Sequence, residues 1–170
     1  MEEITLEQLL ASREERWHRQ MMFIRDFPSL TLVCLTVIMP GAVKRSDRSL
    51  VVAKAAVKAM REAFGDTIRR MDEHDLVTGY EVYLLTTLPV EEAKLTACRI
   101  EDTHPLGRLF DIDVIDQSAT PVSRSIVGMA SRRCLLCDNE ARYCMRNRTH
   151  TPEELHDRIR QMIDDYVQRL

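Results

Sequence analysis

The sequence predicts an α+β (or α/β) fold, in which a small mixed β-sheet packs with about four to five helices. Segments with helical periodicity alternate along the chain with short apolar or β-branched segments. The chain has 170 residues, of which 45% are hydrophobic and 30% charged, as in ordinary globular proteins. Because 5 Gly and 6 Pro leave little room for a flexible linker, we expect a single domain spanning residues 1–170.

Four helices are expected, because their apolar side chains lie three or four positions apart; polar capping residues precede three of them, and Pro89 suits the first position of the other. Thr5 opens a capping box, Ser46 or Asp47 is the expected N-cap of the second helix, and Thr151 precedes the last one. The expected helices cover about 6–24, 47–64, 89–103 and 152–169.

The first helix has an apolar stripe that includes charged positions. The stripe consists of Leu6, Leu10, Trp17, Met21 and Ile24. On a helical wheel Arg13 falls inside this stripe and Arg16 at its margin. If the stripe faces the core, the arginines need an anionic partner, because burying an unpaired charge is costly. That partner is either a structural carboxylate or a phosphate in a pocket.

Three strands are expected between the helices, at about 29–38, 79–88 and 107–116. The first is apolar on both faces, which is typical of a central strand. The segment 120–129 is expected to be an edge strand or an extended stretch.

The third strand carries a D-x-D motif, formed by Asp111 and Asp113. Alternate residues of a strand point to the same side, so these carboxylates share one face. They repel each other unless a cation lies between them, and such a pair suits Mg²⁺ bound together with substrate phosphates. His104, Gly107 and Arg108 directly upstream favour a nucleotidyltransferase-like site over a solvent-facing strand.

The turn before the second helix is a second candidate for phosphate binding. Gly41 allows a close approach of the backbone, Lys44 and Arg45 supply positive charge, and the helix N-terminus offers free N–H groups. The spacing of a Walker A loop is absent, and a plain turn is the alternative interpretation.

The Cys-rich segment at about 132–150 is a candidate zinc site. Cys134, Cys137 and Cys144 form a C-x2-C-x6-C pattern, and His150 would complete a Cys₃His set. The cysteines also fit the buried stripe of a helix, so zinc requires a break near Cys137 or Asn147. A closed set of four ligands would make the site structural rather than catalytic.

The overall composition limits the classes of partner. The net charge is −3, so nucleic acid is not expected, although residues 124–148 contain six arginines against Asp138 and Glu140. The N-terminus is charged and the longest apolar run is too short for a membrane span. We therefore expect a cytoplasmic protein without a membrane anchor, whose odd number of cysteines favours free thiols or metal ligands over disulfides.

Four segments together resemble one known family. They read "LLASREERWHRQ", "VIMPGAVKRSD", "HPLGRLFDIDV" and "SRRCLLCDNEARYCMRNRTH". In this order they are similar to the citrate lyase holo-acyl-carrier-protein synthase family, also called apo-citrate lyase phosphoribosyl-dephospho-CoA transferase. The resemblance covers nearly the whole chain. The family turn more often reads Pro-Gly-Pro-Ile-Lys, whereas this chain has Ala42 and Val43 before Lys44.

The resemblance implies a nucleotidyltransferase reaction. The 5-phosphoribosyl-dephospho-CoA group of 2'-(5-triphosphoribosyl)-3'-dephospho-CoA would pass to a serine of the apo acyl carrier (gamma) subunit of citrate lyase, releasing pyrophosphate. Asp111 and Asp113 would hold Mg²⁺ and His104 would be the general base. The basic segment 124–148 would meet the acidic carrier or the phosphates of the donor. The remaining expected phosphate-binding residues are Arg13, Arg16, Gly41, Lys44, Arg45, Gly107 and Arg108.

Two alternatives remain open at this point. The first is a non-catalytic, zinc-stabilised module that docks on an acidic carrier protein through its arginines. The second is a related transferase that serves another carrier protein, such as that of malonate decarboxylase.

Overall fold

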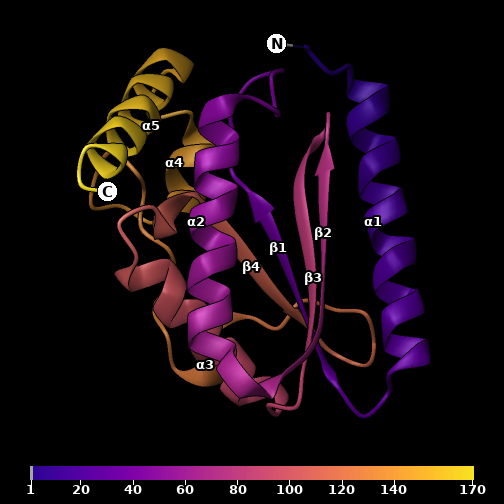
Figure 1. Ribbon diagram of the computed structural model, residues 1–170. Helices are drawn as coiled ribbons and strands as arrows, with labels where there is room; N and C mark the ends of the chain where they lie inside the picture. The colour runs from indigo at the N-terminus through magenta and orange to yellow at the C-terminus, as the bar shows by residue number, and fades with distance from the viewer. Residues whose placement is uncertain (1) are drawn as a thin grey trace.

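The computed structural model describes residues 2–170 and contains, within that range, one four-stranded sheet with helices on both faces (Figure 1). The strands are β1 (Thr31–Val37), β2 (Ile68–Leu76), β3 (Gly79–Thr86) and β4 (Phe110–Ile115), and their order is β2-β3-β1-β4. The predicted α+β class is confirmed, and every pairing among the described strands is antiparallel.

The four expected helices form, and a short fifth one follows the first cysteines. They are α1 (Leu6–Asp26), α2 (Asp47–Phe64), α3 (Val90–Thr103), α4 (Ala141–Asn147) and α5 (Pro152–Val167). Capping boxes begin α1 at Thr5, α2 at Ser46 and α5 at Thr151. Asp47 is therefore the first residue of α2 rather than its N-cap.

The expected strands are present but shorter, and one strand was not predicted. β1 is central, as its two apolar faces indicated. β4 begins only at Phe110, because Gly107–Leu109 forms a 3-10 turn. The segment 120–129, expected to be an edge strand or an extended stretch, forms no strand of the sheet: Pro121 makes a single bridge to Ile115, and a 3-10 turn follows at Arg124–Val127.

The unpredicted strand is β2, which lies at one edge of the sheet and pairs only with β3 among the described residues. Its sequence, IRRMDEHDL, is mostly charged and has an irregular register between Ile68 and Arg70. Charged residues suit an edge strand because they discourage pairing with further chains. Because most of its residues are charged, the strand lacks the alternation of apolar and polar residues that identifies a half-buried strand in a sequence.

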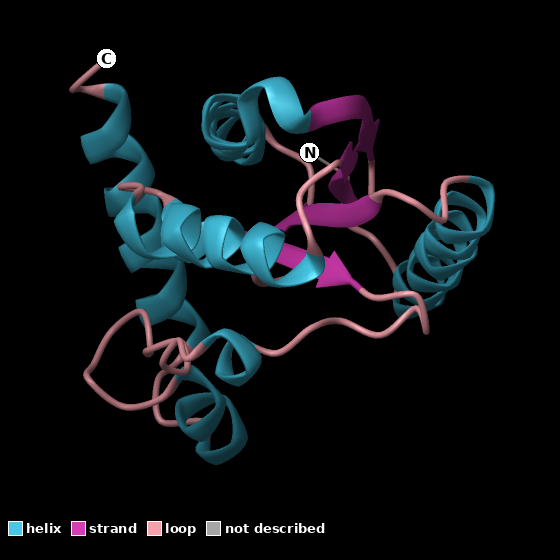
Figure 2. Ribbon diagram, turned by 90° about the horizontal axis from the view of Figure 1, so that it is seen from below, coloured by secondary structure: helices cyan, strands magenta, loops and turns pink. Residues whose placement is uncertain are grey.

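The main core lies on the face of the sheet that α2, α3 and α5 cover. A smaller cluster lies on the opposite face, where Phe23 and Ile24 of α1 and the C-cap residue Phe27 pack near Leu32 and Tyr83. Figure 2 shows α1 on the side of the strands away from the other helices. Within residues 2–170, no helix is both long enough and apolar enough to span a membrane.

The orientation of α1 differs from the prediction. No side chain of this helix is fully buried, and Trp17 of the expected buried stripe is 50% exposed. The helix instead turns Arg16 and Arg19 toward the buried carboxylate of Glu81 on β3, at 2.9 and 3.9 Å. The partner of Arg16 is therefore a structural carboxylate. Leaving the buried Glu81 carboxylate without a charged partner would cost more free energy than exposing the apolar stripe. This difference sets the rotation of the helix.

Candidate active site and metal centre

The two aspartates of the D-x-D motif lie on the face of the sheet that α1 covers. Along β4, Phe110, Ile112 and Val114 enter the main core, so the alternate residues Asp111 and Asp113 point to the other side. They stand opposite Thr36 and Cys34 of β1. The strand thus holds both carboxylates on one side, as the motif predicted.

These carboxylates influence each other. Burial raises the pKa of Asp113, and the neighbouring charge of Asp111 raises it further. Lys94, Arg132 and Arg16 act in the opposite direction. A cation placed between the carboxylates would relieve the remaining repulsion, and two carboxylates are a fitting ligand set for Mg²⁺ that is also bound by phosphates.

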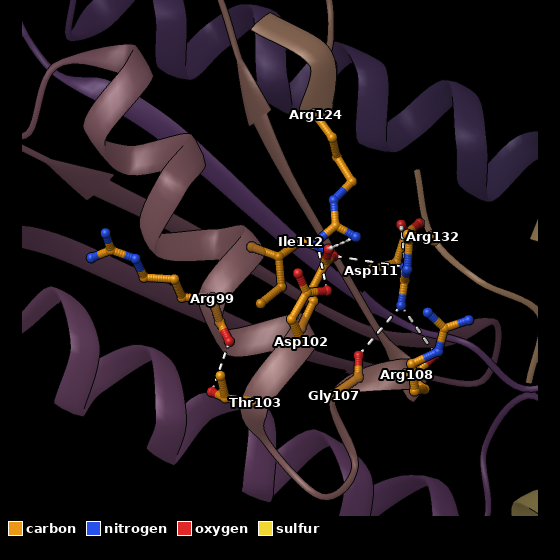
Figure 3. Close-up of polar contacts among 10 residues, drawn as sticks. Arg99, Asp102, Thr103, Gly107, Arg108, Asp111, Ile112, Arg124 and Arg132 are labelled. Carbon is orange, nitrogen blue, oxygen red and sulfur yellow. Dashed lines mark hydrogen bonds and ion pairs between the residues drawn. The ribbon is translucent and has the colours of Figure 1, made fainter. Parts of the chain in front are cut away.

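Arg132 connects this strand to the arginine-rich segment (Figure 3). Its Nη1 lies 3.7 Å from Oδ1 of Asp111 and 3.7 Å from Oε1 of Glu101. Its Nη2 donates to the backbone carbonyls of Gly107 and Arg108, at 3.3 and 3.1 Å. The guanidinium is therefore fixed between the start of β4 and the end of α3.

Glu101 is the buried carboxylate of this network. Its Oε1 accepts a hydrogen bond from the backbone N–H of Ile112 at 2.8 Å, on the outer edge of β4. Its Oε2 lies 4.0 Å from Arg124, and burial raises its pKa although Arg132 opposes that shift. Glu101 thus joins α3, β4 and two arginines.

A pocket of about 420 Å³ adjoins this network. Its lining includes five arginines, namely Arg108, Arg124, Arg132, Arg133 and Arg158. Arg124 is paired with Asp102 at 2.6 Å, whereas no ion pair within residues 2–170 involves Arg108. Burial and the charge of Arg132 lower the pKa of Arg108, so an anion bound in this arginine pocket would relieve the crowded positive charge.

Other predicted site residues lie away from the aspartates. His104 belongs to the opposite face, where its ring contacts Phe110 and Tyr166 and its Nδ1 accepts a hydrogen bond from the Leu106 N–H. Burial lowers the pKa of His104. The structure therefore does not bring His104 together with Asp111.

The turn residues are also engaged elsewhere. Arg45 makes a bidentate pair with Asp75 of β2, with both N–O distances at 2.8 Å. Lys44 donates to the carbonyl of Met39 at 2.6 Å, and burial and the charge of Arg13 lower its pKa. Gly41 adopts a φ of +82°, where a Cβ atom would lie 3.2 Å from the His156 ring.

Arg13 itself is exposed, and Gly107 has a packing role. A Cβ atom at Gly107 would lie 2.3 Å from the carbonyl oxygen of Glu101, so only glycine fits between α3 and β4. This close approach brings the Arg108 backbone carbonyl within reach of Arg132.

Two charged residues of α3 were missed. Lys94 and Glu101 are 4% exposed, seven positions apart on the buried side of the helix. Charges that recur at the spacing of an apolar stripe are a signal that the sequence offers.

The Cys-rich segment brings its four candidate ligands together. One ligand atom from each of Cys134, Cys137, Cys144 and His150 lies within 4.8 Å of the others, and the Sγ atoms of Cys137 and Cys144 are 3.5 Å apart. This Cys-His cluster could hold a metal ion. The helix breaks that such a site requires are present, because α4 starts after Cys137 and ends at Asn147.

The chemistry of the cluster also fits a metal. The buried Nε2 atom of His150 has no hydrogen-bond partner within residues 2–170. Burial disfavours the Cys134 thiolate, but hydrogen bonds from backbone N–H groups and from the Cys144 and Cys137 thiols together outweigh it and lower the pKa of Cys134 to about 7. An unpaired imidazole nitrogen beside a readily ionised thiol is suited to metal ligation.

The strand-borne aspartates and the arginine-lined pocket, which Arg132 connects, form a site suited to a polyphosphate bound together with a cation. The sequence model of one family, described as apo-citrate lyase phosphoribosyl-dephospho-CoA transferase, matches residues 4–166. The chain belongs to this family of transferases.

Individual relatives agree with this assignment. A probable apo-citrate lyase phosphoribosyl-dephospho-CoA transferase of Streptococcus pyogenes serotype M18 (strain MGAS8232) is 34% identical over 99% of this chain and 90% of its own length. A protein of the same description from Vibrio cholerae serotype O1 (strain M66-2) is 38% identical over 96% of this chain and 93% of its own.

Proposed function

We propose that this chain transfers the 5-phosphoribosyl-3'-dephospho-CoA group from 2'-(5-triphosphoribosyl)-3'-dephospho-CoA to a serine of the apo acyl carrier subunit of citrate lyase. The observation that carries this proposal is the arginine pocket, whose Arg132 also contacts Asp111, in a chain of this family. The pocket suits the triphosphate, and the family description names the transferred group and the acceptor. Cytoplasmic action and the absence of a nucleic-acid partner belong to the same proposal.

The residues divide between the metal and the phosphates. Asp111 and Asp113 would hold Mg²⁺, which when bound neutralises charge on the triphosphate and the leaving pyrophosphate. Arg108 and Arg132 would bind the β- and γ-phosphates, because guanidinium groups match phosphate geometry. Lys94 and Glu101, on the buried side of α3, would hold β4 and Arg132 in position.

The reaction exchanges one phosphorus–oxygen bond for another. The serine oxygen attacks the α-phosphorus, the bond to the oxygen that bridges to the β-phosphate breaks, and pyrophosphate leaves while a phosphodiester forms. The serine proton would pass to a carboxylate of the D-x-D motif, since Asp111 and Asp113 are the acidic groups that β4 holds on one face of the sheet. His104 lies on the other face of the sheet, so its geometry favours a structural role.

The Cys-His cluster would bind Zn²⁺ as a structural site. Three thiolates and an imidazole would supply four ligands, and such a full set would leave no open position for a substrate or water. Cys134 and Cys137 also line the arginine pocket. The metal would therefore hold the loop that carries Arg132 and Arg133.

The reaction can be tested with the purified apo carrier subunit, the triphosphate donor and Mg²⁺. Intact mass should rise by the mass of the prosthetic group, and EDTA should abolish the gain. The absence of any gain, with the carrier and donor independently shown to be competent, would overturn the proposal. Parallel incubation with the carrier of malonate decarboxylase tests the related transferase, which predicts modification of that carrier instead.

Asp111→Asn distinguishes an enzyme from a docking module. Transfer should fall about a thousandfold, because a metal–carboxylate interaction contributes several kcal/mol to the transition state, while carrier binding is unchanged. The matched control is Asp116→Asn, since an asparagine Oδ1 can still accept the hydrogen bonds from the Ser118 and Thr120 N–H groups. If the Asp111 variant retains the wild-type rate, the metal role of the motif is wrong.

A further inference from the structure

The outer face of α4 combines exposed arginines with exposed apolar side chains. Tyr143 is 56% exposed and Met145 76%. On a helical wheel Met145, Arg142, Arg146 and Tyr143 follow one another along one arc, and the ligand Cys144 lies on the opposite side. Metal ligation would thus fix this helix with that arc facing solvent.

The arginines of this surface form no ion pairs within residues 2–170. No salt bridge within residues 2–170 involves Arg142, Arg146 or Arg148, although most arginines of α1 and the sheet have a carboxylate partner. The only carboxylate within α4 or at its ends is that of Glu140, its N-cap. The surface therefore carries a net positive charge on a protein whose net charge is −3.

The surface lies directly beside the arginine pocket. The backbone N–H of Ala141, the first residue of α4, donates to the carbonyl of Arg132 at 2.8 Å. Cys134 and Cys137 line the pocket and meet Cys144 of α4 in the Cys-His cluster. A macromolecule bound to α4 would thus lie next to bound triphosphate.

We propose that α4, with Arg142, Tyr143, Met145 and Arg146, is the docking surface for an acidic face of the acceptor protein. The inference rests on the proposed function, which requires a protein acceptor. Arginine, tyrosine and methionine are the side chains enriched in protein interfaces, and unpaired positive charge accelerates and orients association with an acidic partner. The apolar pair on the arc and the negative charge of the whole chain favour a protein over nucleic acid.

The test is the charge-reversal variant Arg142→Glu/Arg146→Glu, compared with the wild type in the transfer assay. The KM for the carrier should rise about tenfold or more, because like-charge contacts at an interface cost several kcal/mol. The kcat at saturating carrier should not change, and neither should the KM for the donor. The salt dependence of the carrier KM should also become weaker.

The control is Arg99→Glu/Arg169→Glu, which makes the same change in net charge at exposed positions without ion pairs within residues 2–170. It should leave the carrier KM at the wild-type value. An equal rise in both variants, or an unchanged KM in the α4 variant, would overturn the docking surface. If the α4 variant loses its metal, Arg142→Gln/Arg146→Gln should still raise the carrier KM with full metal content, and an unchanged KM would overturn the proposal.

A direct binding measurement separates this proposal from the proposed function. Labelled apo carrier is titrated with wild type and variant without donor, and its fluorescence anisotropy is followed. Weaker binding to the α4 variant supports docking even if wild type transfers nothing, in which case only the function fails. If the variant loses affinity for a duplex oligonucleotide but binds the carrier as wild type does, the docking surface is wrong.

Discussion

Arg132 lies 3.7 Å from Asp111 and hydrogen-bonds the two carbonyls that begin the turn into the same strand. One guanidinium thereby spans the D-x-D motif, the 3-10 turn and the arginine pocket. Because Glu101 holds Arg132 from α3, the geometry of the aspartates and that of the pocket depend on each other.

Replacing this guanidinium should weaken donor binding. In Arg132→Lys the positive charge is kept, but lysine lacks the planar guanidinium whose several N–H groups can reach both carbonyls and a phosphate. We expect the KM for the triphosphate donor to rise roughly tenfold to hundredfold, the range of a charged hydrogen bond. Steady-state kinetics with Arg99→Lys as the control checks this. A donor KM equal to that of wild type would show that Arg132 does not bind the donor.

A methyl group at Gly107 should destabilise the protein. The added Cβ would lie 2.3 Å from the carbonyl oxygen of Glu101, so α3 and β4 must separate. We expect Gly107→Ala to lower the free energy of unfolding by about 3 kcal/mol, the upper range for overpacking. Gly128→Ala is the comparison, since its site is open and it has only the cost of a positive φ, about 1 kcal/mol. Urea titration measures both, and equal losses would refute the steric argument.

Metal content should track the Cys-His cluster. Purified protein should contain about one zinc ion per chain, and Cys144→Ser should remove most of it. Chelation should lower the melting temperature by roughly 5 °C or more, since each kcal/mol corresponds to about 2–4 °C at this size. Cys98→Ala, which changes a buried cysteine outside the cluster, should keep its zinc. Elemental analysis that finds zinc in the Cys144 variant would contradict the ligand set.

The half-buried His104 should contribute to acid sensitivity. Burial lowers its pKa in the folded state below the ordinary value of 6.5, so the unfolded chain takes up the proton first as the pH falls. Stability is complete above pH 6.5 and is lost as the pH falls through the folded pKa. His104→Gln lacks this titration, so the difference in unfolding free energy between wild type and variant should narrow between pH 7.5 and about 5.5. A difference independent of pH would show that His104 is not involved.

Local features of the sequence determined the helix starts, the central strand and the candidate metal ligands. The capping boxes at Thr5, Ser46 and Thr151 involve residues three positions apart, so their hydrogen bonds can be predicted from spacing alone. The alternation of β4 likewise predicted that Asp111 and Asp113 share a face. The ligand identities of the Cys-His cluster followed from the residue types.

Only the tertiary structure decided which face each charged group meets. Arg16 and Glu81 are 65 positions apart, and their contact, rather than the apolar stripe, sets the orientation of α1. His104 is seven residues from Asp111 but lies across the sheet, because a turn separates the end of α3 from β4. The charged strand β2 exists because β3 offers it a pairing edge. Such contacts depend on chain segments that fold against one another, and neither periodicity nor spacing encodes them.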